Sequence, residues 1–94
     1  MDKVEARSVA LAKVTELRQM TWDELRSRYL KQPETVEVTA ASGAVYQVES
    51  YALWDGAKER DLRVIVAVDD GGWRAFAPLS EEFIIAPDGS YVDE

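Results

Sequence analysis

The chain contains neither cysteine nor histidine. Without cysteine it has no disulfide, no thiolate nucleophile and no cysteine-based zinc site, and without histidine it lacks the commonest general base. Acid–base, nucleophilic or metal chemistry would have to use carboxylates, hydroxyls or lysine. This inventory disfavours an enzyme, and it predicts that packing supplies the stability of the fold.

Long apolar runs are also missing. The longest ones, residues 64–68 and 83–86, fall far short of the roughly 20 residues that a bilayer span requires. The first 20 residues carry seven charges, which leaves no apolar segment for a signal peptide. We therefore expect no membrane segment and a cytoplasmic location. With 94 residues, the chain is long enough for one hydrophobic core, so a single domain over residues 1–94 is expected.

Basic residues are scarce after residue 31. Residues 1–31 hold seven basic and five acidic side chains, whereas residues 32–94 hold four basic and thirteen acidic ones, within a net charge of −7. A surface of that sign repels phosphate backbones, so we expect no nucleic-acid binding, and it attracts a basic partner. The alternative is that the surplus carboxylates only keep a small protein soluble.

The first third of the chain has a helical pattern. Residues 3–17 place their apolar side chains on one side of a helical wheel at about 100° per residue, with Asp2 available as the cap. The pattern predicts an amphipathic helix with a buried face made of Val4, Ala10, Leu11, Val14 and Leu17.

A break near Arg18 is expected, because a continuous helix would place this charge within the apolar stripe. Thr21 followed by Glu24 matches the capping box, in which the two side chains bind the free amides of a helix start. The sequence predicts a second helix from Trp22 to about Leu30, with Trp22, Leu25 and Tyr29 buried, and one kinked helix over residues 3–30 is the alternative.

From residue 35 onward the apolar period changes from 3.6 to 2, which indicates strands. Residues 35–40 and 45–53 are predicted to form a hairpin around a turn at Ser42 and Gly43, and residues 62–68 form a third, central strand. The turn signal at residues 69–72 predicts a hairpin to a fourth strand at residues 73–77. Residues 80–82 start a helical turn or lead into a short strand at 83–85, and a turn at residues 87–90 returns the chain.

These patterns predict an α+β fold. An N-terminal helix or helix pair, within residues 2–31, packs on one face of a four- to five-stranded antiparallel sheet that occupies residues 35–93.

Two pairs of adjacent carboxylates are the candidates for metal binding or hydrolysis. Asp69 and Asp70 precede two glycines, where aspartate is typical of a turn because its side chain binds nearby amides. Glu81 and Glu82 follow a serine, where acidic residues stabilise a helix N-terminus. Both pairs are therefore explained by local structure, and we expect neither a metal nor another cofactor.

The aromatic residues indicate a binding surface. Trp54 is expected at the end of the second strand and Trp73 at the start of the fourth, near one rim of the sheet, and large aromatics at a rim are typical of interfaces. The alternative is that they cap a thin core. Around the two tryptophans, the predicted binding site includes the acidic residues of the neighbouring loops, Asp55, Glu59, Asp61, Asp69 and Asp70.

The last third of the chain resembles short bacterial proteins of unknown function, in the run of residues 64–72 followed by Arg74, Phe76, Pro78 and Leu79 and then residues 83–90. The resemblance implies a small stable fold and a bacterial or phage source, and it carries no activity. We expect a non-enzymatic interaction protein, of the inhibitor, immunity or antidefence type, that binds a basic protein partner as a monomer or weak homodimer. The alternative is a small-ligand or metal-dependent hydrolytic domain.

Overall fold

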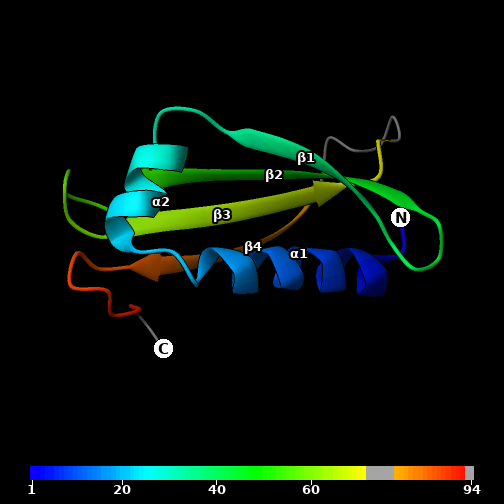
Figure 1. The fold of residues 1–94 in the computed structure, drawn as a ribbon, viewed down its shortest axis with the longest axis horizontal. Helices are drawn as coiled ribbons and strands as arrows, with labels where there is room; N and C mark the ends of the chain where they lie inside the picture. The colour runs from blue at the N-terminus through cyan, green and yellow to red at the C-terminus, as the bar shows by residue number, and fades with distance from the viewer. Residues whose placement is uncertain (72–77, 93–94) are drawn as a thin grey trace.

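Two helices are followed by four strands in the computed structural model, which describes residues 1–71 and 78–92. The strands form one antiparallel sheet in the order β1-β2-β3-β4, so each strand pairs with its neighbours in sequence (Figure 1). This arrangement confirms the predicted α+β class. The elements are α1 (Lys3–Leu17), α2 (Trp22–Tyr29), β1 (Glu34–Thr39), β2 (Val45–Trp54), β3 (Leu62–Asp69) and β4 (Leu79–Ile85).

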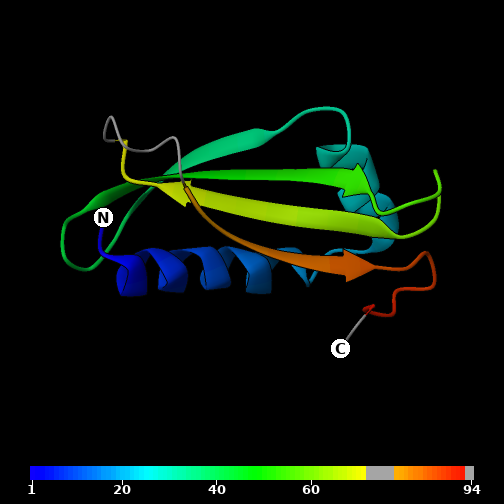
Figure 2. The same ribbon diagram turned by 180° about the vertical axis from the view of Figure 1, so that it is seen from behind.

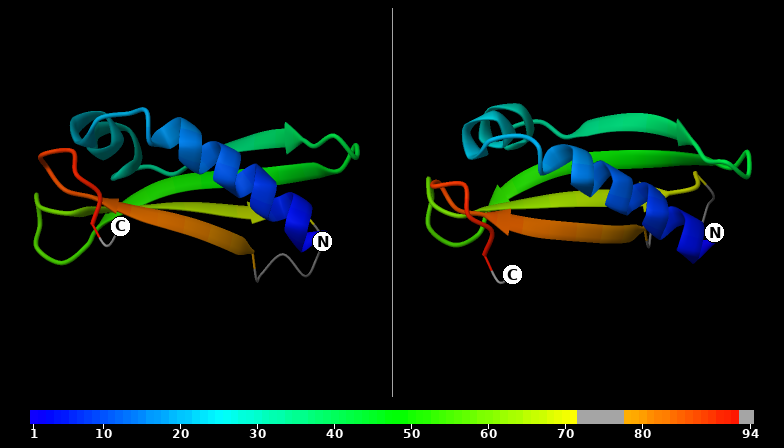
Figure 3. Two further views of the ribbon diagram at one scale, coloured as in Figure 1. Left: turned by 90° about the horizontal axis from the view of Figure 1, so that it is seen from below. Right: turned by 60° about the horizontal axis from the view of Figure 1, so that its bottom comes forward.

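Both helices pack on the same face of the sheet (Figures 2 and 3). The longer helix, α1, runs along the sheet and contacts β3 and β4, while α2 lies at one end and contacts β2 and β3. Neither helix within the described residues is long and apolar enough to cross a membrane.

The helical region consists of two helices, as the capping box predicted. Thr21 accepts a hydrogen bond from the Glu24 amide at 3.1 Å, and the Glu24 carboxylate accepts one from the Thr21 amide at 2.8 Å. α1 ends at Leu17, and Arg18 follows as its C-cap. The Arg18 guanidinium lies over the aromatic rings of Phe83 and Tyr91, at 5.1 and 4.5 Å from the ring centroids, so this charge packs on aromatic faces next to β4.

Of the five side chains predicted to form the buried face of α1, Ala10, Val14 and Leu17 are buried, whereas Val4 and Leu11 are exposed. Val4 and Leu11 are 80% and 47% exposed, whereas Ala6 and Ala10 are fully buried with Val14 and Leu17. The helix contacts the sheet through the side that carries the two alanines, because small side chains allow a close approach to β3 and β4. Leu11 is rotated by about 100° from Ala10 and therefore lies off this face.

The central strands supply most of the sheet's contribution to the core. The four inward-facing residues of β3 are fully buried, and its outward residues Ile65 and Ala67 are half-buried, as expected for a central strand. Ser50 on β2 lies opposite Val66, and its buried hydroxyl has no hydrogen-bond partner among the described residues. The inward-facing residues of β3 are Leu62, Val64, Val66 and Val68.

β4 confirms the predicted alternative in which residues 80–82 lead into a strand at residues 83–85. The strand expected at residues 73–77, with Trp73, lies outside the described residues. Residues 80–82 belong to β4, so Glu81 and Glu82 do not start a helix. The apolar side chains of Leu79, Phe83 and Ile85 point inward and follow the two-residue alternation of a strand. The turn at residues 87–90 is confirmed by two hydrogen bonds, from the Ala86 amide to the Ser90 carbonyl and from the Gly89 amide to the Ala86 carbonyl, both 2.8 Å.

Candidate functional site

The structure divides the predicted site between opposite ends of the sheet. Trp54, Asp55, Glu59 and Asp61 lie at the end of β2 and in the loop to β3, whereas Asp69 and Asp70 follow at the other end of β3. Because a strand rises about 3.3 Å per residue, β3 separates the two groups by roughly 25 Å. The described residues of the predicted site therefore do not form one surface, and Trp73 lies outside the described part of the chain.

At the first end, Trp54 packs within the molecule. Its ring lies 6.0 Å from that of Trp22 on α2, and the Arg26 guanidinium lies 5.9 and 6.0 Å from the two ring centroids. The Trp22 indole donates a hydrogen bond of 2.9 Å to the Arg60 carbonyl. These contacts attach α2 to the loop between β2 and β3, so the alternative in which the aromatic residue caps the core describes Trp54 better.

The acidic residues of this loop are engaged in ion pairs. The Arg26 Nε donates to the Glu59 carboxylate at 2.8 Å, and this hydrogen bond holds the pKa of Glu59 below its usual range. Arg63 donates to Asp55 at 2.7 Å and to Glu82 on the neighbouring strand. Asp61 accepts a hydrogen bond from the Asp55 amide through its backbone carbonyl at 2.9 Å. Asp55 and Glu59 are therefore already neutralised by arginines.

At the second end, the Asp69 side chain binds a backbone amide of the turn, as its sequence context predicted. Its carboxylate accepts a hydrogen bond from the Gly71 amide at 2.8 Å, and Gly71 has a φ of 76°, which glycine adopts without strain. Asp70 lies 3.6 Å from the Met1 ammonium group and therefore beside the start of α1.

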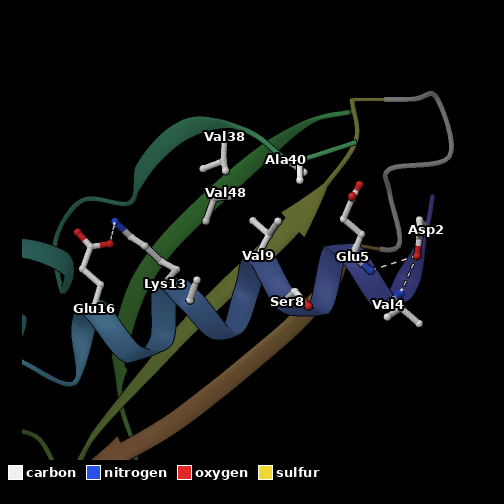
Figure 4. Close-up of a pocket in the computed structure, with 12 residues that line it drawn as sticks. Asp2, Val4, Glu5, Ser8, Val9, Lys13, Glu16, Val38, Ala40 and Val48 are labelled. Atoms are coloured by element: carbon white, nitrogen blue, oxygen red, sulfur yellow. Dashed lines mark hydrogen bonds and ion pairs between the residues drawn. The ribbon is translucent and has the colours of Figure 1, made fainter. Parts of the chain in front are cut away.

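A groove of about 580 Å³ lies beside α1 (Figure 4). One wall is the side of α1 that faces away from β4, and the floor and other wall come from β1, β2 and the turn between them. We call this feature the α1–β1 groove. Its apolar lining consists of Val4, Val9, Ala12, Val38, Ala40, Ala41 and Val48, and its polar lining of Asp2, Glu5, Ser8, Lys13 and Glu16.

Carboxylates gather at the end of the groove near the start of α1. Asp2 caps the helix by accepting hydrogen bonds from the Val4 and Glu5 amides at 3.0 and 3.1 Å. The Glu5 carboxylate accepts hydrogen bonds from Ser42 at 2.7 Å and from Tyr46 at 2.8 Å. The bond to Glu5, burial, and the negative charges of Glu5, Asp2 and Asp70 raise the pKa of Tyr46 to about 12. This end of the groove therefore has a negative potential.

At the other end, the lysine in the groove lining is neutralised. Lys13, whose side chain is 13% exposed, lies 3.0 Å from Glu16 and 3.9 Å from Glu34. Glu34 also accepts a hydrogen bond from Arg28 at 2.8 Å, which is the main cause of the lowered pKa of Glu34. The polar lining of the groove thus has three carboxylates and one ammonium group, and its net charge is negative.

The carboxylate pairs do not converge on a common point. Glu81 and Glu82 are neighbours on a strand, so their side chains point to opposite faces, where they pair with Arg7 at 3.5 Å and with Arg63. Among the described residues, no group of three or more acidic side chains is arranged to hold a metal ion. The carboxylates of these pairs are thus placed in a turn and in ion pairs.

The sequence analysis missed the groove, although part of its signal was present. Val38 and Ala40 were predicted to lie on one face of an amphipathic strand, but which helix would cover that face depends on where α1 packs.

Comparison of the chain with protein-family models, with curated proteins and with solved structures yields no match.

Proposed function

We propose that this protein is a non-enzymatic binding protein that takes an apolar, basic segment of a protein partner into the α1–β1 groove. The observation that carries the proposal is the groove itself, whose volume of about 580 Å³ falls within the range of ligand sites and whose lining is mostly apolar with few polar groups. An apolar floor supplies affinity, and the excess of carboxylates selects a positively charged partner.

The arrangement of the carboxylates supports binding over hydrolysis. A carboxylate-based hydrolase needs two such groups facing each other across a substrate. Glu81 and Glu82 point to opposite faces of β4, Asp69 binds the Gly71 amide, and Asp70 lies beside the Met1 ammonium group. An inhibitor, immunity or antidefence role suits a small acidic protein of this kind, because electrostatic steering accelerates its association with a basic target.

Substitutions on α1 test the proposal. Ala12→Trp places a large side chain in the groove, and Leu11→Trp places the same side chain next to it at an exposed position that does not line the groove. The parent protein and both variants are immobilised and exposed to a lysate of the source organism at low and high salt. We expect a basic protein that the parent and Leu11→Trp retain and that Ala12→Trp loses, with retention decreasing as salt rises.

The variants must first be shown to fold, by circular dichroism and thermal unfolding. If every protein retained by the parent is retained equally by folded Ala12→Trp, the groove is not the binding site and the proposal fails.

A further inference from the structure

The helical layer covers only part of the inner face of the sheet. α1 contacts β3 and β4, and α2 contacts one end of β2 and β3 before the chain leaves the layer at Leu30. Beside α1, the groove floor on β1 and β2 carries Val38 and Ala40, which are half-buried, and Val48, which is 1% exposed (Figure 4). The groove of about 580 Å³ is therefore where a further element can pack beside α1.

The hydrogen bonding of the floor determines which kind of element fits. Along the floor, the backbone groups of β1 and β2 that face each other pair in the antiparallel ladder, and the remaining groups of β1 point to the outer edge of the sheet and not into the groove. An extended segment lying in the groove would leave its own amides and carbonyls without partners, whereas a helix pairs them internally. The α1 wall presents Ser8 and Ala12, one helical turn apart, and such small side chains allow a second helix to approach closely.

The charges determine the chemistry and the direction of the occupant. The carboxylates of Asp2 and Glu5 line one end of the groove, where Asp70 is paired with the Met1 ammonium group, and at the other end Lys13 is paired with Glu16 at 3.0 Å. A positively charged side chain is therefore favoured at the end near Asp2, and an acidic one is disfavoured there.

Building on the proposed function, we propose that the α1–β1 groove binds an amphipathic helix of the partner protein, with lysine or arginine at the end that lies beside Asp2 and Glu5. The wall from Glu5 to Glu16 spans about 16 Å, so the bound helix has about three turns, with apolar residues at i, i+3, i+4 and i+7 facing Val38, Ala40 and Val48. A second copy of this chain is a poorer occupant, because each copy has a net charge of −7.

Synthetic peptides of about three helical turns test this proposal. The first has leucine at i, i+3, i+4 and i+7 with lysine at one end, the second has glutamate in place of lysine, and the third keeps the lysines but alternates leucine with polar residues and contains proline. Titration calorimetry measures their binding to the protein. We expect the first peptide to bind at least about tenfold more tightly than the second and the third.

Matched variants locate the bound peptide. Ala12→Trp should weaken binding of the first peptide by about tenfold or more, while Leu11→Trp leaves it within about twofold. The double variant Asp2→Asn/Asp70→Asn keeps a helix cap and should weaken binding severalfold at low salt. Its control, Glu37→Gln/Glu49→Gln, removes the same charge from exposed positions on the opposite face of the sheet and should leave binding unchanged.

The possible outcomes are distinguishable. If the first peptide does not bind, or binds Ala12→Trp as tightly as the parent, the helix proposal is overturned. If only the extended peptide binds and Ala12→Trp abolishes this binding, the groove is still a binding site, so the proposed function stands and the helix does not. A dimer in light scattering that dissociates in Ala12→Trp would identify the occupant as a second copy and would also overturn the helix.

Discussion

Replacing Ser50 by alanine should make the protein more stable, although most substitutions of buried residues have the opposite effect. Ser50 is fully buried between Glu34 on β1 and Val66 on β3, and no group in the described part of the chain forms a hydrogen bond with its hydroxyl. A buried hydroxyl without a partner has lost its hydrogen bonds to water and gained nothing in return. Ser50→Ala removes this hydroxyl and leaves the rest of the strand in place.

The size of the effect follows from two opposing contributions. Burial of an unpaired hydroxyl costs about 1–3 kcal/mol in protein mutational data, and alanine is less favourable in strands than serine by a few tenths of a kcal/mol. The net gain in the free energy of unfolding for Ser50→Ala should be about 1 kcal/mol, which corresponds to a rise in Tm of about 5 °C for a domain of this size.

The reciprocal substitution is the control. Ala52 lies two residues away on the same buried face of β2 and is 2% exposed. Ala52→Ser introduces a buried hydroxyl and should lower the stability by about 1–2 kcal/mol. Urea denaturation followed by tryptophan fluorescence measures both changes. A loss of more than about 0.5 kcal/mol in Ser50→Ala would refute the reasoning, because it would show that the hydroxyl has a hydrogen-bond partner in solution.

Two further predictions concern the core and the acidic end of the groove. Leu25→Ala removes a fully buried side chain of α2 and should destabilise the protein by about 2–4 kcal/mol in urea denaturation, and a change below about 1 kcal/mol would mean that α2 is not packed as described. Tyr46 has its pKa raised from 10.0 to about 12 in the folded state, mainly by its hydrogen bond to Glu5. Its stabilising contribution is therefore fully present below pH 10 and is lost as the pH rises toward 12. The stability of Tyr46→Phe should consequently fall less steeply than that of the parent over this interval, and identical slopes in denaturation at several alkaline pH values would contradict the assignment.

The elements whose signals are local were predictable from the sequence. The capping box at Thr21 and Glu24 identified the start of α2, and the alternation along β2 and β3 identified the buried face of the sheet. The start of β4 was harder to predict from the sequence. Ser80, Glu81 and Glu82 also suit the start of a helix, and the sequence does not show that β3 lies beside them.

The candidate site was less predictable than the fold. The predicted residues were selected because they lie near strand ends in the sequence, but the register places Asp55 and Asp70 at opposite ends of β3. The groove depends on how α1 lies on the sheet, which is determined by Ala6 and Ala10 and not by the larger Val4 and Leu11. The helical pattern therefore identified Ala10, Val14 and Leu17 correctly but missed Ala6, through which α1 also approaches the sheet.

The contact between α1 and β4 has a consequence for folding during synthesis. Each strand pairs with the next one along the chain, so the sheet can grow hairpin by hairpin as the nascent chain emerges. The first helix, however, packs on the last strand, and Tyr91 donates a hydrogen bond of 3.0 Å to the Arg18 carbonyl, 73 residues away in sequence. The apolar face of α1 thus lacks part of its packing surface until β4 has left the ribosome, and the domain reaches its native packing only when nearly the whole chain is available.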